Sequence, residues 1–351
     1  MGVMSFLRDG ESRRLDRQAR PAGQGDLPTG SAALTNSPIN ATRRPDGRHA
    51  PPGGRHAVAL ARSTTSRFTA SPRHIPHASR VRSAMPGTPQ SFLAGLAAEV
   101  QDGPVGRSEF VFLHGLTFDR RHWHPVLDEL RAGGEEHRTL ALDLPGHGGS
   151  PRWPAYQLRD VTEAVHRAAV EAGFGRPVVV GHSIGGVLAT LYAATHPAAG
   201  VVNIDQPLLA GPFAEMLRRN EQVLRSEDCL RVWDELISTM GVEQLAPAAR
   251  ELVASADTPR QDLLLGYWSE LMTASPSDLT TKREEDLRAI SAAGLPYLHV
   301  SGRQVPPGYR AWQKRALPEA GIAVVPSHSH FPHLTHPAEL AALISRLPGA
   351  R

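Results

Sequence analysis

The chain has 351 residues, with 38 basic and 35 acidic side chains, a formal net charge of +3 at pH 7 and one cysteine. The single cysteine, Cys229, excludes an intramolecular disulfide framework, so a reducing, cytoplasmic compartment is the default expectation. No stretch approaches the roughly 18 to 20 apolar residues needed to span a bilayer. The composition therefore predicts a globular protein without a membrane partner.

The charge is unevenly distributed along the chain. Residues 1–85 carry 14 arginines and five acidic residues, whereas the remainder carries 24 basic and 30 acidic residues. The basic surplus belongs to this tail, so no nucleic-acid partner is expected for the folded part. Residues 1–87, rich in Arg, Pro and Ala and without periodicity, are predicted to be a disordered extension. They resemble an organelle transit peptide, although a translated leader with Met85 as the true start is the favoured interpretation.

Residues 88–351 alternate between short β-branched runs and amphipathic stretches, which is typical of a mainly parallel sheet flanked by helices. In chain order, the predicted strands are 110–113, 139–142, 178–180, 201–204, 297–300 and 323–325. The predicted helices are 121–132, 158–173, 185–196, 308–316 and 337–347. Residues from about 208 to 290 break the alternation with apolar residues at helical spacing. We expect a helical cap inserted there, with additional core helices as the alternative.

The most informative motif is Gly181-His182-Ser183-Ile184-Gly185, which follows a β-branched run and precedes a helix-forming one. In that context the G-x-S-x-G pattern predicts a nucleophile elbow, in which a tight turn holds the serine hydroxyl clear of the backbone. Glycines on both sides of Ser183 suit such a turn because it leaves no room for side chains. Ser183 is therefore the candidate nucleophile.

Three further segments follow predicted strands. They are Leu113-His114-Gly115-Leu116-Thr117-Phe118-Asp119-Arg120-Arg121-His122-Trp123, Asp143-Leu144-Pro145-Gly146-His147-Gly148-Gly149-Ser150 and Ser329-His330-Phe331-Pro332-His333-Leu334-Thr335-His336-Pro337. Together with the elbow, in this order, they resemble the α/β-hydrolase family. The resemblance covers about residue 90 to the C-terminus and implies the α/β-hydrolase fold.

The resemblance also implies roles for individual residues. The base corresponds to His330, the one of four C-terminal histidines that matches the family pattern His-Phe-Pro-His-Leu-x-x-Pro. Backbone N–H groups of Leu116 and Ile184 match the two donors that stabilise an oxyanion. His114, Asp143, His147 and His182 match positions that shape loops. The four C-terminal histidines, at positions 328, 330, 333 and 336, lack the cysteine or carboxylate neighbours of zinc motifs, so no metal is predicted.

The acid departs from the most common family pattern, because no carboxylate occurs between Asp286 and Glu319, where the usual site falls. Some members place the acid one strand earlier, and Asp205 ends the matching run here. A carboxylate there could orient the imidazole of His330 and stabilise its cation. The alternative is that Asp205 is a helix cap or loop residue, which would leave a dyad enzyme or no enzyme.

The leading hypothesis is a serine hydrolase that acts on a small ester-like or lactone substrate through Ser183, His330 and Asp205 and an acyl-enzyme. The alternatives are a non-catalytic ligand-binding protein of the same fold and a lyase that uses the same three residues. No phosphate-binding loop, dinucleotide fingerprint or zinc spacing appears, so no cofactor is predicted. The expected partner is a small-molecule substrate, and the sequence does not indicate an oligomeric state.

Overall fold

The computed structural model describes residues 91–104, 108–134 and 137–347. The predicted disordered extension over residues 1–87 and a domain boundary at residue 88 lie outside these residues. Cys229 lies within them and is buried. No helix in the described ranges is long and apolar enough to cross a bilayer.

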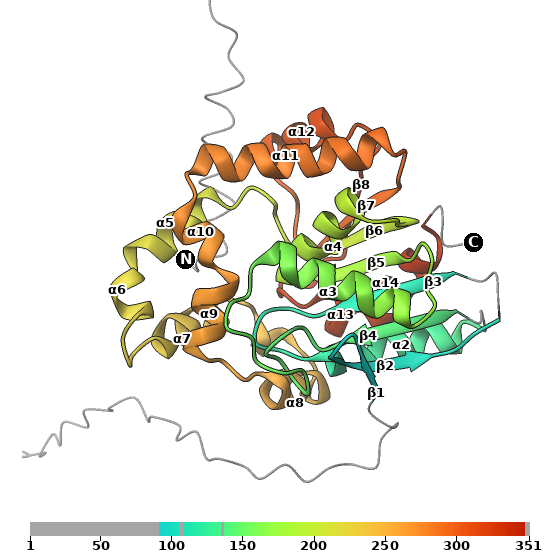
Figure 1. Cartoon of the computed structure of the whole chain (residues 1–351), viewed down its shortest axis with the longest axis horizontal. Coiled ribbons are helices and arrows are strands. Elements are labelled where there is room, and N and C mark those ends of the chain that lie inside the picture. Colours follow the sequence, from blue (N-terminus) through green and yellow to red (C-terminus); the bar gives the residue numbers. More distant parts are fainter. Residues whose placement is uncertain (1–90, 105–107, 135–136, 348–351) are drawn as a thin grey trace, which may run out of the picture. The chain divides into compact units, whose positions relative to one another are not determined.

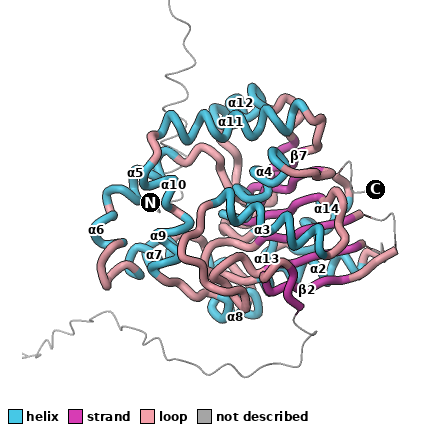
Figure 2. The backbone as a smooth tube through the Cα atoms, viewed as in Figure 1, coloured by secondary structure: helices cyan, strands magenta, loops and turns pink. Residues whose placement is uncertain are grey.

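The described chain forms one eight-stranded sheet (Figures 1 and 2). Its spatial order is β1-β2-β4-β3-β5-β6-β7-β8. The pairings of β1 with β2 and of β2 with β4 are antiparallel, and the remaining five are parallel. The strands are β1 (Ser91–Leu93), β2 (Leu96–Gln101), β3 (Glu109–Leu113), β4 (Arg138–Leu142), β5 (Val178–His182), β6 (Gly200–Ile204), β7 (Tyr297–Ser301) and β8 (Gly321–Val324).

The six parallel strands are those predicted from their β-branched runs, with ends shifted by at most two residues. Central strands such as β5 and β6 are buried along their whole length, which explains their continuous apolar character. The hairpin β1–β2 was not predicted, because β1 has only three residues and is mostly exposed. The carboxyl ends of the parallel strands meet at one edge of the sheet, and the sequence motifs follow those ends.

Helices cover both faces of the sheet (Figure 1). On one face the apolar core joins sheet residues to α3 (Leu158–Glu171), α4 (Ile184–Thr195) and α12 (Pro307–Ala316). On the other face it joins them to α2 (His124–Ala132) and α14 (Pro337–Ser345). The predicted helix 121–132 is divided into a 3-10 turn, η1 (Arg120–Trp123), followed by α2. This two-sided covering is the predicted α/β architecture.

Between β6 and β7 the chain forms a run of helices, in the region where a cap was expected. They are α5 (Gly211–Arg219), α6 (Glu221–Leu224), α7 (Leu230–Ser238), η2 (Val242–Gln244), α8 (Pro247–Ala256), α9 (Gln261–Tyr267), α10 (Ser269–Thr273) and α11 (Pro276–Ala292). Buried side chains from this run, including Trp233, Leu264 and Trp268, belong to the same apolar cluster as the sheet residues Val111 and Val179. The run is therefore packed onto the core by burial of apolar surface.

Candidate active site

Ser183 lies in a strained turn between β5 and α4. Its backbone has φ 53° and ψ −125°, a conformation that residues other than glycine rarely adopt. A Cβ atom at Gly181 would overlap the backbone of Gly185, and one at Gly185 would overlap the carbonyl oxygen of Leu113. Glycine at both positions is therefore what lets β5 turn directly into α4 with Ser183 at the apex.

His330 and Asp205 form a buried hydrogen-bonded pair. Asp205 follows β6 with φ 49°, and His330 lies in the loop between β8 and α13 (Pro332–Thr335). The ring Nδ1 of His330 donates to Asp205 Oδ2 at 2.9 Å, and the two side chains are 3% and 4% exposed. A carboxylate can only accept, so this contact directs the Nδ1 proton toward Asp205 and leaves Nε2 as the basic nitrogen. Nε2 has no hydrogen-bond partner among the described residues.

Two further donors hold the Asp205 carboxylate. Its Oδ1 accepts the backbone N–H of Gly302 at 2.9 Å and the hydroxyl of Ser301 at 3.2 Å. Both donors belong to the end of β7, where most relatives would place the acid. The segment at the end of β7 has no carboxylate of its own, and it instead supplies two hydrogen-bond donors to the Asp205 carboxylate at the end of β6.

The backbone of His330 is held from two sides. His182 Nε2 donates to the carbonyl oxygen of His330 at 2.8 Å, and the His330 N–H donates to the carbonyl oxygen of Met240 at 2.7 Å. The Ser329 hydroxyl also donates to the Met240 carbonyl, at 3.1 Å. Met240 follows α7, so the loop that carries His330 is tied directly to the helical run. Sequence reasoning missed this tie because a carbonyl group leaves no residue signature.

The predicted oxyanion donors lie in two turns beside Ser183. Among the described residues, no acceptor faces the backbone N–H of Leu116 or of Ile184. The next residue, Thr117, has φ 70°, and its N–H donates to His147 Nε2 at 3.0 Å. That bond fixes the turn that presents the N–H of Leu116. Two unpaired backbone donors beside a nucleophile are what a developing oxyanion requires.

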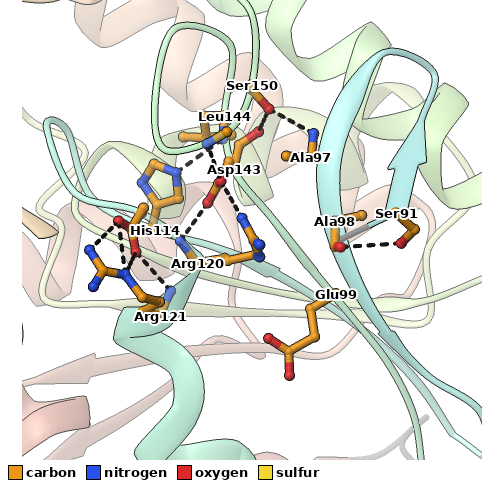
Figure 3. Close-up of polar contacts among 12 residues, drawn as sticks. Ser91, Ala97, Ala98, Glu99, His114, Arg120, Arg121, Asp143, Leu144 and Ser150 are labelled. Carbon is orange, nitrogen blue, oxygen red and sulfur yellow. Dashed lines mark hydrogen bonds and ion pairs between the residues drawn. The ribbon is translucent and has the colours of Figure 1, made fainter. Parts of the chain in front are cut away.

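Asp143 and His114 hold the loops after β3 and β4 together (Figure 3). The Asp143 carboxylate accepts the N–H of Arg120 at 2.8 Å and that of Gly149 at 2.6 Å, and it forms an ion pair with the Arg120 guanidinium. His114 Nε2 accepts the N–H of Leu144 at 3.0 Å. Both side chains are fully buried. They shape loops, as the sequence analysis expected.

A cluster of buried histidines lies next to His330. The His182 ring is tilted against two others, with its centroid 4.7 Å from that of His330 and 4.3 Å from that of His333, and the His122 centroid lies 5.8 Å from that of His333. Burial lowers the pKa of His122, His182 and His333 well below the usual value. These rings are therefore neutral at pH 7, and the His333 ring packs against Trp123.

All five predicted site residues line one pocket. Ser183, His330, Asp205, Leu116 and Ile184 meet there, at the carboxyl edge of the sheet. The helical run adds eight apolar side chains to this lining, namely Phe213, Trp233, Leu236, Met240, Tyr267, Trp268, Leu271 and Leu279. A serine, an imidazole paired with a carboxylate, and two free backbone donors thus open into a mainly apolar space.

Comparison with known proteins places the chain in a family. The model of the alpha/beta hydrolase family matches residues 110–343. A pimeloyl-[acyl-carrier protein] methyl ester esterase of Yersinia enterocolitica is 28% identical over 256 residues, which cover 68% of this chain and 92% of that relative.

Solved structures of similar fold include an enol-lactonase from Burkholderia xenovorans LB400, with a TM-score of 0.58 and 18% identity, which covers 73% of this chain and 98% of that one. A thermophilic esterase from Thermogutta terrifontis has a TM-score of 0.55 and 21% identity, and covers 73% of this chain and 97% of the other. The family model spans most of the folded residues and all four motifs. The chain therefore belongs to the alpha/beta hydrolase family.

Proposed function

We propose that this protein is a serine hydrolase for small, mainly apolar esters or lactones. The observation that carries the proposal is the 2.9 Å contact of His330 Nδ1 with Asp205 Oδ2, in a pocket that Ser183 also lines. A serine hydroxyl needs an oriented base to become a nucleophile, and a buried carboxylate is the group that orients it. The resemblance of the chain to named esterases points to the same chemistry.

The proposed reaction has two steps. Ser183 Oγ attacks the ester carbonyl carbon while its proton passes to His330 Nε2, and the imidazolium then gives that proton to the departing alcohol. Water, deprotonated in turn by Nε2, attacks the acyl-enzyme and releases the carboxylic acid and free Ser183. Asp205 remains ionised and stabilises the imidazolium in both steps.

The N–H groups of Leu116 and Ile184 stabilise the negative charge that develops on the carbonyl oxygen. Because backbone groups do this, the side chains of the two residues are free to be apolar and to help keep water from the site. In the same account the helices from α5 to α11 form the cap. Their side chains supply the apolar surface on which the substrate is bound.

Two relatives narrow the substrate class. One is named for the methyl ester of a pimeloyl group on an acyl-carrier protein, and one structural neighbour is named an enol-lactonase. Both names describe an acyl–oxygen bond cleaved by water. A carbonyl ester with a small alcohol as leaving group is therefore the substrate that we propose for this chain.

Hydrolysis of p-nitrophenyl esters by the wild-type chain and by Ser183→Ala tests the proposal. We expect the variant to lose about 10⁴- to 10⁶-fold in kcat, because the nucleophile is removed. Ser238→Ala is the matched control, since this exposed hydroxyl only contacts its own helix. Turnover that survives in Ser183→Ala, with a folded protein by circular dichroism, contradicts the proposal.

A further inference from the structure

A second pocket adjoins the one that contains Ser183. The two have cavity volumes of about 110 Å³ and about 520 Å³, respectively. They share three lining residues: Leu158 at the start of α3, Glu270 on α10 and Arg283 on α11. These three side chains therefore form the boundary between the pockets, and we call them the partition.

Helix α4 gives the distance from Ser183 to the partition. Val187 lines the first pocket and Leu191, one turn further on the same face, lines the second. At a rise of about 1.5 Å per residue, Val187 and Leu191 lie about 6 Å and about 12 Å along the axis from Ser183. The partition crosses between them. An extended acyl chain with C–C bonds of about 1.5 Å advances about 1.25 Å per carbon because it zigzags, so roughly five to ten carbons cover this span.

The partition is held by ion pairs. Arg283, only 8% exposed, pairs with Glu270 and with Asp286, each at 3.3 Å. Glu270 also pairs with Lys282 at 2.7 Å. Apart from Asp205, Glu270 and Arg283 are the charged residues of an otherwise mainly apolar lining.

This ion-pair arrangement makes the boundary a firm stop for an apolar chain. A methylene group inserted between Arg283 and Glu270 would break their ion pair and exclude water from both charges. It offers no polar contact to replace what is lost. The guanidinium already faces two carboxylates, so it does not present a free cation to an anionic substrate end. The first pocket therefore favours a chain with an apolar terminus that stops short of Arg283.

We propose that the Leu158–Glu270–Arg283 partition sets the acyl-chain length of the substrate, selecting esters with acyl groups of roughly five to ten carbons. The inference rests on the proposed function, since it places the acyl chain in the pocket beside Ser183. Glu270, Arg283 and Leu158 are then specificity-determining residues. Opening the partition joins the first pocket to the second and admits longer chains.

The test compares methyl octanoate with methyl dodecanoate in four proteins. These are the wild-type chain, Glu270→Ala and Leu158→Ala, which open the partition from two sides, and Thr273→Ala as control. Thr273 is exposed and lines only the second pocket, and its hydroxyl bonds only to the carbonyl oxygen of Ser269 in its own helix. Binding is measured by calorimetry in the Ser183→Ala background, where no turnover occurs, and hydrolysis is measured with Ser183 present.

With the partition intact, we expect methyl octanoate to bind about tenfold or more tightly than methyl dodecanoate. Glu270→Ala and Leu158→Ala should each reduce that ratio about tenfold, and Thr273→Ala should leave it unchanged. An unaltered ratio in both opening variants, each folded by circular dichroism, overturns the proposal, as does equal binding of the two esters to the intact partition. The proposed function fails separately if the chain binds the esters according to their length but the protein with Ser183 hydrolyses none of them.

Discussion

The loops at the carboxyl edge of the sheet and the helical run between β6 and β7 build the same pocket by different means. In the loops, Thr117, Ser183, Asp205 and His328 all have positive φ values, and the groups that face the reaction are held by backbone contacts. The helical run contributes mainly apolar side chains. For the proposed reaction, the difference teaches that backbone geometry positions the reacting groups, whereas the sizes of the helix side chains select the substrate.

The two regions meet at a few polar contacts. The hydroxyl of Thr117 donates to Asp257, Tyr267 donates to the carbonyl oxygen of Pro145 at 3.0 Å, and the N–H of His330 donates to Met240 at 2.7 Å. Each contact joins a strand-end loop to the helical run. Away from these contacts, changes in the loops should lower kcat for every substrate, and changes within the helices should alter selectivity.

The largest effect that separates the regions is expected from Asp205→Asn. The amide keeps the shape of the side chain but cannot stabilise an imidazolium, and it can turn the His330 ring into the wrong tautomer. We expect kcat to fall about 10⁴-fold with little change in KM. Steady-state kinetics on a p-nitrophenyl ester measure this. A kcat near the wild-type value would show that His330 does not depend on Asp205.

A smaller loss of kcat is expected from Gly241→Ala, at the junction of the two regions. Gly241 has φ 71°, and a Cβ there would lie 2.6 Å from the carbonyl oxygen of His328 and 3.0 Å from Ser329 Cα. The added methyl should displace the loop that carries His330 and lower kcat about 100-fold, since misplacement by about 1 Å has that cost.

Gly294→Ala is the matched control for this junction. Gly294 has a similar φ of 65°, but nothing lies within 4 Å of its Cβ position. Both variants carry the same backbone strain, and only Gly241→Ala clashes with the His330 loop. Equal kcat values for the two variants would contradict a coupling between the helical run and His330.

The smallest effect is a loss of folding stability in acid, which we expect from the buried imidazole of His333. Burial lowers the pKa of His333 well below its usual value, so the unfolded chain binds a proton that the folded chain excludes. Stability from this residue is complete above about pH 6.5 and falls as the pH drops below it, by about 1.4 kcal/mol per pH unit.

Urea unfolding of the wild-type chain and His333→Phe at pH 8 and pH 5.5 measures this effect. Phenylalanine keeps an aromatic ring against Trp123 and removes the titrating group. We expect the wild-type chain to lose more stability between the two pH values than the variant does. Equal losses would show that His333 takes up no extra proton on unfolding.

The sequence predicted the parallel strands and their order in the chain because each is a short, mainly apolar run, of which Val178-Val179-Val180 is the most β-branched. The hairpin of β1 and β2 was missed, since Ser91–Leu93 is too short and too exposed to carry a burial signal. The helical spacing of apolar residues such as Trp233 and Trp268 predicted helices between β6 and β7. The spacing did not indicate that both tryptophans line the pocket, because that depends on how separate helices pack.

For the site, the sequence motifs predicted Ser183 and His330. The absence of carboxylates between Asp286 and Glu319 favoured Asp205 as the acid. The structure brings Asp205 and His330 together at 2.9 Å. The tie from His330 to Met240 and the ion pair of Glu270 with Arg283 were not predicted. Both arise from tertiary contacts between segments that share no motif.

Labelling with a fluorophosphonate probe, followed by mass-spectrometric mapping of the adduct, tests the central claim most directly. Such a probe reacts rapidly only with a serine whose proton an oriented base removes. We expect one adduct, on Ser183, that is absent in Ser183→Ala and forms far more slowly in Asp205→Asn. A folded wild-type chain that stays unlabelled, or that carries its adduct on another residue, would contradict the assignment of Ser183, His330 and Asp205 to one proton-transfer system.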